Sequence, residues 1–162
     1  MFVVSRTHRY HFSASHRLHT SALSEAQNAE LYGKCNNPYG HGHDYTLEIT
    51  IEGPVDETTG LITPQGDLDL LVRDRILPLF SHRNINLDVP HFRNLVASTE
   101  NIALVMIELL ENAWTDYITA PSAFLRRIHI QETGRNGFDV VLPRAVETGQ
   151  HAHQQKEALL SA

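Results

Sequence analysis

Residues 43–53 read His-Asp-Tyr-Thr-Leu-Glu-Ile-Thr-Ile-Glu-Gly. Within this stretch Tyr45, Leu47, Ile49 and Ile51 alternate with polar residues. Successive side chains of a strand point to opposite faces, so the alternation predicts a strand with one buried face and one hydrated face. This pattern is typical of an antiparallel sheet that is covered by helices on one side only.

The segments on either side predict three more strands and two helices. Apolar residues at helical spacing indicate the helices, and Ser98 or Thr99 is suited to cap the second one. The predicted elements are strands over residues 2–13, 43–53, 123–133 and 137–142, and helices over about 66–80 and 99–114. Strands and helices come in separate runs, which indicates an α+β fold with a four-stranded antiparallel sheet and two helices on one face.

The connection over residues 14–42 is long and contains one short helical stretch, for which Ser24 is a suitable N-cap. The chain has 162 residues, which is enough for one domain. We expect a single domain over residues 1–142 and a polar C-terminal tail over 143–162. Histidines in that tail are expected to be solvated.

Composition and charge exclude several classes of protein. The longest apolar run, Ile102-Ala-Leu-Val-Met-Ile, is far shorter than the roughly 20 residues of a transmembrane helix. The N-terminus lacks a basic region followed by an apolar core, so we expect no secretory signal. A net charge of −6 argues against general nucleic-acid binding. A single cysteine fits a reducing compartment, and we expect a cytoplasmic protein without nucleic-acid or membrane partners.

Three of the 11 histidines are placed to share a metal ion. His41 and His43 stand at the entrance to a predicted strand, and residues i and i+2 project to the same side. His16 lies just past the predicted first strand, so antiparallel pairing of the two strands brings it to the pair. Three imidazoles with one open position suit a Zn²⁺ ion, although exposed loop histidines are the alternative.

Cys35 and His82 are candidates for proton transfer. Cys35 lies in a Gly/Asn/Pro turn six residues before His41. Its thiol is open to three interpretations: a small buried hydrophobe, a fourth zinc ligand, or a thiolate favoured by Lys34 and a nearby dication. His82 follows the first predicted helix and is suited to act as the imidazole partner of a reactive cysteine, or is an ordinary surface residue.

Glu132 is the candidate for ligand recognition. It shares its side of the third predicted strand with Ile128 and Ile130, so its carboxylate must be paired or must serve a ligand. A carboxylate grips a guanidine-like edge, such as that of a pterin or a guanine, through two parallel hydrogen bonds. A surface glutamate at a strand end is the alternative. Hydrogen-bonded or solvated roles are expected for the histidines at positions 8, 11, 19, 91 and 129.

Two helices cover only one face of a four-stranded sheet, so the chain is expected to form an oligomer that covers the other face.

Five blocks of sequence resemble one known family when they are taken together and in order. The blocks are Phe12-Ser-Ala-Ser-His-Arg-Leu, Gly33-Lys-Cys-Asn-Asn-Pro-Tyr-Gly-His-Gly-His, Ser81-His-Arg-Asn-Ile-Asn-Leu-Asp-Val-Pro, Ser98-Thr-Glu-Asn and Gln131-Glu-Thr. From about residue 5 to residue 142 the chain resembles the 6-pyruvoyltetrahydropterin synthase family, and it is closer to the tetrahydrobiopterin-type synthases than to their queuosine-pathway relatives.

This resemblance implies a tunnelling fold, in which three subunits join their sheets into a β-barrel and two trimers stack into a homohexamer. It implies conversion of 7,8-dihydroneopterin triphosphate to 6-pyruvoyltetrahydropterin and triphosphate, without a nicotinamide cofactor. The implied site residues are the zinc ligands His16, His41 and His43, the base Cys35, its partner His82 from a neighbouring subunit, the pterin anchor Glu132, and Ser98, Thr99 and Glu100 around the pterin.

One position departs from the family. The family usually places Asp immediately before the catalytic histidine, and Ser81 stands there in this chain. A hydroxyl stabilises an imidazolium only weakly, so Asp44 or Asp88 is a candidate replacement. The departure also keeps two alternatives open, a 6-carboxytetrahydropterin synthase or an enzyme that cleaves the dihydroneopterin side chain. A non-catalytic metal-binding oligomer is the alternative of another class.

Overall fold

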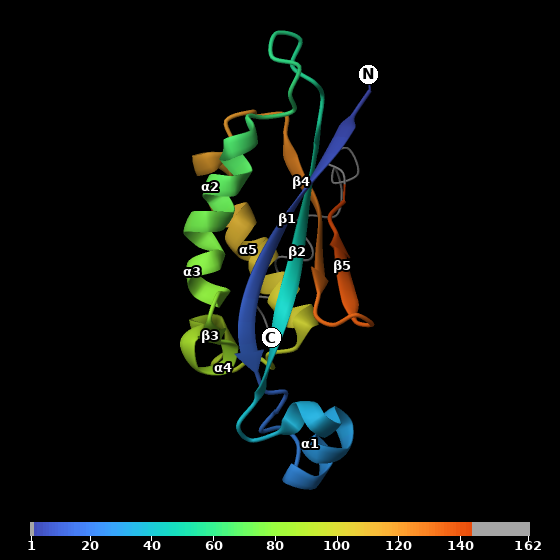
Figure 1. The fold of residues 1–162 in the computed structure, drawn as a ribbon, viewed down its shortest axis with the longest axis vertical. Coiled ribbons are helices and arrows are strands. Elements are labelled where there is room, and N and C mark those ends of the chain that lie inside the picture. Colours follow the sequence, from blue (N-terminus) through green and yellow to red (C-terminus); the bar gives the residue numbers. More distant parts are fainter. Residues whose placement is uncertain (1, 144–162) are drawn as a thin grey trace.

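The computed structural model describes residues 2–143 and contains one mixed five-stranded sheet of order β3-β1-β2-β4-β5. Helices lie on one side of this sheet, and the short helix α1 lies beyond its lower end in Figure 1. The strands are β1 (Val4–His16), β2 (His41–Gly53), β3 (Arg83–Asn84), β4 (Phe124–Gln131) and β5 (Gly137–Val141). The helices are α1 (Glu25–Tyr32), η1 (Gly33–Asn36), α2 (Gln65–Arg75), α3 (Leu77–Phe80), α4 (Ile85–Asp88), η2 (Pro90–Phe92) and α5 (Thr99–Tyr117).

The α+β class and the four predicted strands are confirmed, and the structure adds β3. This two-residue strand pairs in parallel with Ala14 and Ser15 of β1, so the sheet is mixed rather than purely antiparallel. A pairing this short leaves no periodic pattern in the sequence. It nevertheless fixes where the segment around His82 lies, because the backbone N–H of His82 donates to the carbonyl of Ser13.

The pairing of β1 with β2 is antiparallel and runs over both strands from end to end. The first strand extends through His16, so this residue ends the strand rather than following it as predicted. In the observed register His16 stands opposite His41, and Ala14 stands opposite His43. The long ladder therefore carries the histidines to one end of the sheet.

The helix predicted over residues 66–80 is divided into α2 and α3 at Ile76. Pro78 explains the break, because proline lacks an amide hydrogen and its ring clashes with the carbonyl four residues earlier. The predicted caps Ser24 and Ser98 are both confirmed: each side-chain oxygen accepts a hydrogen bond from the backbone of its helix.

The core lies between the sheet and the helices. Alternate residues of β2, including Leu47, Ile49 and Ile51, are fully buried and share one hydrophobic cluster with Leu71 of α2 and Met106 of α5. Burial of such side chains stabilises each by about 1.5–3 kcal/mol. None of the helices described over residues 2–143 is both long and apolar enough to cross a membrane.

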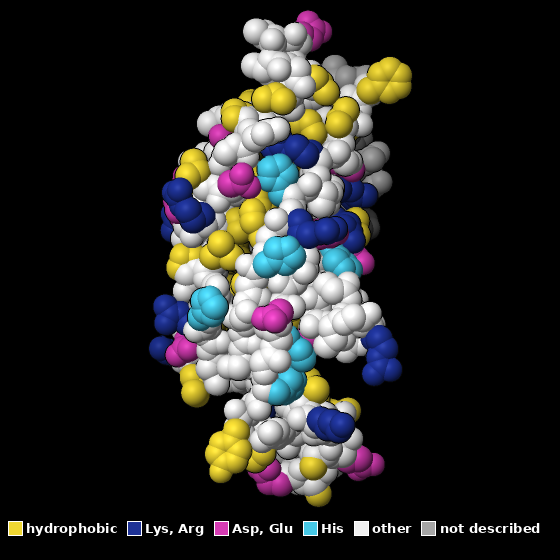
Figure 2. Space-filling model, viewed as in Figure 1, with side chains coloured by type: hydrophobic (Ala, Val, Ile, Leu, Met, Phe, Trp, Pro, Cys, Tyr) yellow, Lys and Arg dark blue, Asp and Glu magenta, His cyan; other side chains and the backbone are white. Residues whose placement is uncertain are grey.

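The other face of the sheet is polar (Figure 2). Arg9 donates two hydrogen bonds to Glu48, and this contact holds the pKa of the Glu48 carboxyl below its usual value. Arg127 and His129 contact Asp139 on the same face. His129 thus faces the wetter side, as the sequence predicted.

Candidate metal centre and its surroundings

His16, His41 and His43 converge at the end of the β1–β2 ladder. One ring nitrogen from each lies within 4.8 Å of the others. The ring centroids are 4.7–5.2 Å apart and the rings are steeply inclined to one another, which turns their edges toward a common point. The predicted convergence of these three side chains is confirmed.

The tautomer of His16 is set by the protein. Its side chain is 1% exposed, and its Nδ1–H donates a 2.7 Å hydrogen bond to the carbonyl oxygen of Ala97. The lone pair therefore resides on Nε2, which faces the other two rings. A metal-binding histidine typically gives its second nitrogen to such a backbone acceptor.

Gly40 allows His41 to approach β1. Its φ is +71°, and a Cβ at this position would lie 2.9 Å from the backbone oxygen of His16. A larger residue is excluded by both the backbone conformation and the space. The turn that ends at Gly40 therefore allows His41 to pair directly opposite His16.

The ring nitrogens of this group fit a cation. His16 Nε2, His41 Nδ1 and His43 Nε2 are buried and have no hydrogen-bond partner within residues 2–143. Burial is the main cause that lowers the pKa of both His16 and His41, with the neighbouring imidazoles adding to the effect. Neutral imidazoles with free, converging lone pairs are the form that binds a metal ion.

Glu132 lies beside the histidines. Its Oε1 is 3.6 Å from His16 Nε2 and 3.9 Å from His43 Nε2, and its side chain is 12% exposed. The hydroxyl of Thr99, at the N-terminus of α5, donates a 2.5 Å hydrogen bond to the same oxygen. The carboxylate of Glu132 is thus fixed next to the three histidines, and its oxygens can still accept hydrogen bonds from a ligand.

Ser98 and Glu100, which were also predicted to lie around a ligand at the N-terminus of α5, have different environments from that of Thr99. Ser98 accepts a hydrogen bond from the backbone N–H of Asn101 and so caps the helix. Glu100 is exposed. Of the three, Thr99 is the one that contacts Glu132.

Cys35 lies in η1 and its thiol is partly buried. Within residues 2–143, the group of side chains that could hold a metal ion consists of the three histidines and does not include this thiol. Burial, and secondarily the charge of Glu132, raise the pKa of Cys35. Without a metal ion, therefore, the surroundings favour the thiol over the thiolate that Lys34 was expected to promote.

His82 is held in a left-handed backbone conformation, with φ of 57°. This conformation is uncommon for non-glycine residues and here projects an exposed side chain beside the sheet. His82 lines a shallow depression of about 500 Å³ together with Ser13, His43 and Asp44. Cys35 does not line this depression, so the single chain does not join the two predicted catalytic side chains in one cavity.

Asp44 and Asp88 have distinct roles in this region. Asp44 shares the depression with His82 and accepts a 2.5 Å hydrogen bond from Ser13. The carboxylate of Asp88 accepts a hydrogen bond from the backbone N–H of Asn84. Asp88 therefore supports the local backbone, whereas Asp44 faces the same space as the imidazole.

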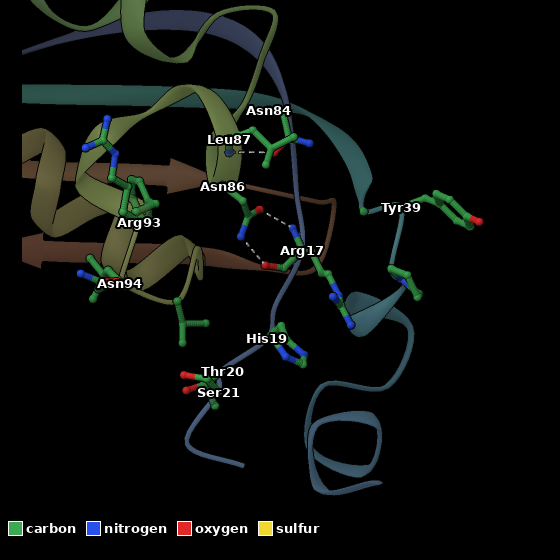
Figure 3. A pocket seen from close by; sticks show the side chains of 15 residues that line it. Arg17, His19, Thr20, Ser21, Tyr39, Asn84, Asn86, Leu87, Arg93 and Asn94 are labelled. Atoms are coloured by element: carbon green, nitrogen blue, oxygen red, sulfur yellow. Dashed lines mark hydrogen bonds between the residues drawn. The ribbon is translucent and has the colours of Figure 1, made fainter. Parts of the chain in front are cut away.

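Two buried or half-buried amides were not anticipated from the sequence. Asn86 pairs with both backbone groups of Arg17, at 2.7 and 3.0 Å, and so fixes the chain directly after His16 (Figure 3). Asn36 donates to the carbonyl of Leu18. Isolated asparagines in turn-rich segments give no periodic signal, so their long-range partners could not be predicted.

Comparison with known proteins shows which family the chain belongs to. The sequence profile of the family described as 6-pyruvoyl tetrahydropterin synthase matches residues 5–141. A 6-pyruvoyl tetrahydrobiopterin synthase from Poecilia reticulata is 41% identical over 125 residues, which cover 77% of this chain and 81% of that protein. The Homo sapiens protein of the same name is 38% identical over 128 residues, covering 79% and 84% respectively.

A solved structure supports the same relationship. The 6-pyruvoyl tetrahydropterin synthase of Caenorhabditis elegans superposes with a TM-score of 0.79 at 36% identity, covering 88% of this chain and 98% of that one. The match to the sequence profile extends from β1 to β5 and therefore includes the histidine group and Glu132. The chain belongs to the 6-pyruvoyl tetrahydropterin synthase family.

Proposed function

We propose that the protein is a zinc-dependent lyase that converts 7,8-dihydroneopterin triphosphate to 6-pyruvoyltetrahydropterin and inorganic triphosphate. The observation that carries this proposal is the three-histidine group with the carboxylate of Glu132 fixed beside it. The names of the similar proteins support the same activity.

His16, His41 and His43 would hold the zinc ion. A zinc ion held by three neutral nitrogen donors would polarise the side-chain hydroxyls of the substrate and acidify the adjoining C–H bonds. The hydrogen bond from His16 to Ala97 keeps its Nε2 available as a ligand.

Glu132 anchors the pterin ring. An ionised carboxylate accepts two parallel N–H hydrogen bonds from a guanidine-like edge. Thr99 holds the carboxylate in place, and Ser98 and Glu100 flank the ring at the start of α5. A ring held by Glu132 would lie on the same side of the sheet as the histidines.

Cys35 removes a carbon-bound proton from the substrate side chain, and His82 of a neighbouring subunit exchanges protons with it. The electron pair of the broken C–H bond forms a double bond as the C–O bond to triphosphate breaks, so triphosphate leaves as the anion. The remaining hydrogens shift within the product, and no external oxidant is required. The thiolate of Cys35, which a bound dication would favour, and an imidazole are suited to such transfers near neutral pH.

Asp44 stabilises the imidazolium of His82, a role for which the hydroxyl of Ser81 is poorly suited. The shared depression of Asp44 and His82 supports this assignment, and the backbone hydrogen bond of Asp88 argues against the alternative.

The proposed assembly is a homohexamer of two trimers. Both edges of the sheet support it: β3 covers only residues 14 and 15 of β1, and β5 is the opposite edge strand. Unpaired edges are templates for strand pairing with another chain, which would also enclose the polar face. The mass of the assembly in solution, measured by native mass spectrometry, tests this stoichiometry.

Incubation of zinc-loaded protein with 7,8-dihydroneopterin triphosphate, followed by mass analysis, tests the activity. Equimolar triphosphate and a 6-pyruvoyl product are expected, and the Cys35→Ala variant should form neither. A 6-carboxy product or a product with a cleaved side chain would instead indicate one of the related reactions. Full retention of zinc with no turnover of any dihydropterin would favour a non-catalytic oligomer.

A further inference from the structure

Glu132 stands in a turn, over residues 132–136, that joins β4 to β5. Within this turn the backbone N–H groups of Glu132 and Thr133 both donate to the carbonyl of Asn136, at 2.9 and 3.3 Å. The position of the Glu132 side chain therefore depends on how firmly the turn is closed. The proposed reaction uses Glu132 but gives no role to its neighbour Gln131.

Gln131 closes the turn from the other face of the sheet. Successive residues of a strand point to opposite faces, so Gln131 lies on the polar face with His129, whereas Glu132 faces the metal-binding histidines. The amide nitrogen of Gln131 donates to the carbonyl of Thr133 and, at 3.1 Å, to the carbonyl of Asn136. One side chain thus joins the first and last parts of the turn.

His129 fixes the orientation of this amide. Because the amide nitrogen of Gln131 donates to two carbonyls, its oxygen faces His129, and the Nε2–H of His129 donates to that oxygen over 3.1 Å. The other ring nitrogen of His129, Nδ1, lies 3.2 Å from Oδ1 of Asp139 on β5. The imidazole is therefore held between two partners, and the amide of Gln131 cannot flip without losing all three of its hydrogen bonds.

Gly137 provides the space that this pair of side chains needs. It stands opposite Gln131 in the register of β4 and β5. Its backbone lies outside the left-handed region, so its conformation does not require glycine. A Cβ at this position would lie 2.8 Å from Cε1 of His129 and 2.9 Å from Oε1 of Gln131. Any larger residue would therefore push both side chains away from their observed positions.

The turn also contacts the carboxylate of Glu132 directly. The amide nitrogen of Asn136 donates a long hydrogen bond of 3.4 Å to Oε2, whereas Thr99 of α5 donates to Oε1. The plane of the carboxylate is thus set from two sides, by α5 and by the turn. A guanidine-like edge presents two parallel N–H groups, so it can be held by two bonds only when both carboxylate oxygens lie in its plane.

We propose that Gln131 is a positioning residue for Glu132. By closing the turn it sets the plane of the carboxylate, and it thereby makes the site selective for a ring that carries an amino group beside a ring N–H. His129 and Gly137 maintain the orientation of the Gln131 amide. The proposal rests on the proposed function, in which Glu132 anchors the pterin ring, and Gln131 acts through Glu132 without touching the substrate.

Two substitutions test the proposal. Gly137→Ala adds one methyl group, which should displace the side chains of His129 and Gln131. Gly134→Ala is the matched control in the same turn, because a Cβ there would meet no atom within 4 Å. Gln131→Met is the second variant, since it keeps the length of the side chain and removes its two donors.

The measurement is the affinity of the zinc-loaded full chain for neopterin and for the corresponding lumazine, by isothermal titration calorimetry. An oxygen replaces the ring amino group in the lumazine, so Glu132 can accept only one N–H hydrogen bond from it, and the unaltered chain should prefer neopterin. A hydrogen bond to a charged group is worth about tenfold in affinity or more, so Gly137→Ala and Gln131→Met should each bind neopterin about tenfold more weakly. Their affinity for the lumazine and their zinc content should stay near those of the unaltered chain. Gly134→Ala should retain the full preference.

The proposal is overturned if Gly137→Ala and Gln131→Met keep the preference of the unaltered chain for neopterin. It is also overturned if both variants lose affinity for neopterin and the lumazine in parallel, because that result would show a general loss of structure and no effect on the plane of the carboxylate. An unaltered chain that does not distinguish the two ligands would instead reject the anchoring role of Glu132 in the proposed function, and this proposal with it.

Discussion

Nδ1 of His16 donates a 2.7 Å hydrogen bond to the carbonyl oxygen of Ala97, which joins the last residue of β1 to the loop before α5. Asn101 stabilises this loop by donating to the carbonyl of Val96. The contact leaves Nε2 of a buried imidazole without a proton and aimed at two further imidazoles. The hydrogen bond to Ala97 thus orients Nε2 of His16 so that it can bind a metal ion without a change in the protein.

Loss of any one ligand should abolish tight metal binding. His41→Ala leaves two imidazoles, which cannot complete a three-ligand site, so purified protein should contain far less than one zinc ion per chain. Inductively coupled plasma mass spectrometry measures this content. His91→Ala, which removes an exposed histidine outside the group, should retain the metal, and equal zinc content in both variants would contradict the assignment.

The metal-free protein should lose stability in mild acid. The pKa of His16 is lowered from 6.5, mainly by burial, so below pH 6.5 the unfolded chain takes up a proton that the folded chain does not. As the pH is lowered below 6.5, the free energy of unfolding therefore decreases, with a slope approaching about 1.4 kcal/mol per pH unit. The decrease ends when the pH reaches the lowered pKa of His16 in the folded chain. Urea unfolding at pH 7.5 and pH 5.5 measures this change, and zinc should oppose it because metal binding requires neutral imidazoles.

Glu132→Gln should make Cys35 more reactive in the metal-free protein. Burial and the charge of Glu132 both raise the pKa of this thiol above 9.0, and the substitution removes the second cause. Alkylation by iodoacetamide at pH 8 should therefore be faster, because the thiolate is the reactive form. Glu111→Gln on α5 is the control with the same loss of charge. Equal rates for the two variants would show that Glu132 does not influence the thiol.

Thr99→Val should weaken pterin binding without loss of zinc. The side chain is 2% exposed and donates to Glu132, and valine keeps its shape without the donor. A hydrogen bond to a charged group contributes about 1.5–3 kcal/mol, so the KM should rise at least tenfold. Thr99→Ser should restore most of the affinity, whereas Thr46→Val on the polar face should leave it unchanged. A KM unaffected by Thr99→Val would mean that the carboxylate does not need this support.

Asp44→Asn should lower turnover by about tenfold and alter the pH profile of kcat. The substitution removes the carboxylate that shares a depression with His82, so the imidazolium is less stable. Adding Ser81→Asp to this variant should recover activity, because it supplies a carboxylate next to the histidine. Asp88→Asn should instead affect thermal stability, since Asp88 accepts from the backbone of Asn84. Unchanged kinetics in Asp44→Asn would remove Asp44 from the mechanism.

Local periodicity in the sequence predicts much of the fold. Alternation at Leu47, Ile49 and Ile51 predicted a strand with one buried face, and the structure buries these residues fully. The division of the long helix at Ile76 was missed, although Pro78 was the available signal. The two-residue strand β3 was also missed, because so short a pairing depends on the neighbouring strand and not on its own sequence.

The sequence by itself determined the convergence of the three histidines. The spacing of His41 and His43 at the start of one strand, and the position of His16 at the end of the strand that pairs with it, require only antiparallel pairing to converge. Only the tertiary structure decided which ring nitrogen of His16 is free and that Thr99 supports Glu132. It also decided that Asp44 rather than Asp88 faces His82. The cavity that Figure 3 shows, which is lined by both Arg17 and Arg93, likewise depends on the packing of the whole chain. The physical reason is the distance along the chain between the residues concerned. Periodicity and register depend on residues that are close along one strand or opposite each other in one pair of strands. The hydrogen bonds and charge interactions join side chains that are far apart in the sequence and meet only in the packed chain.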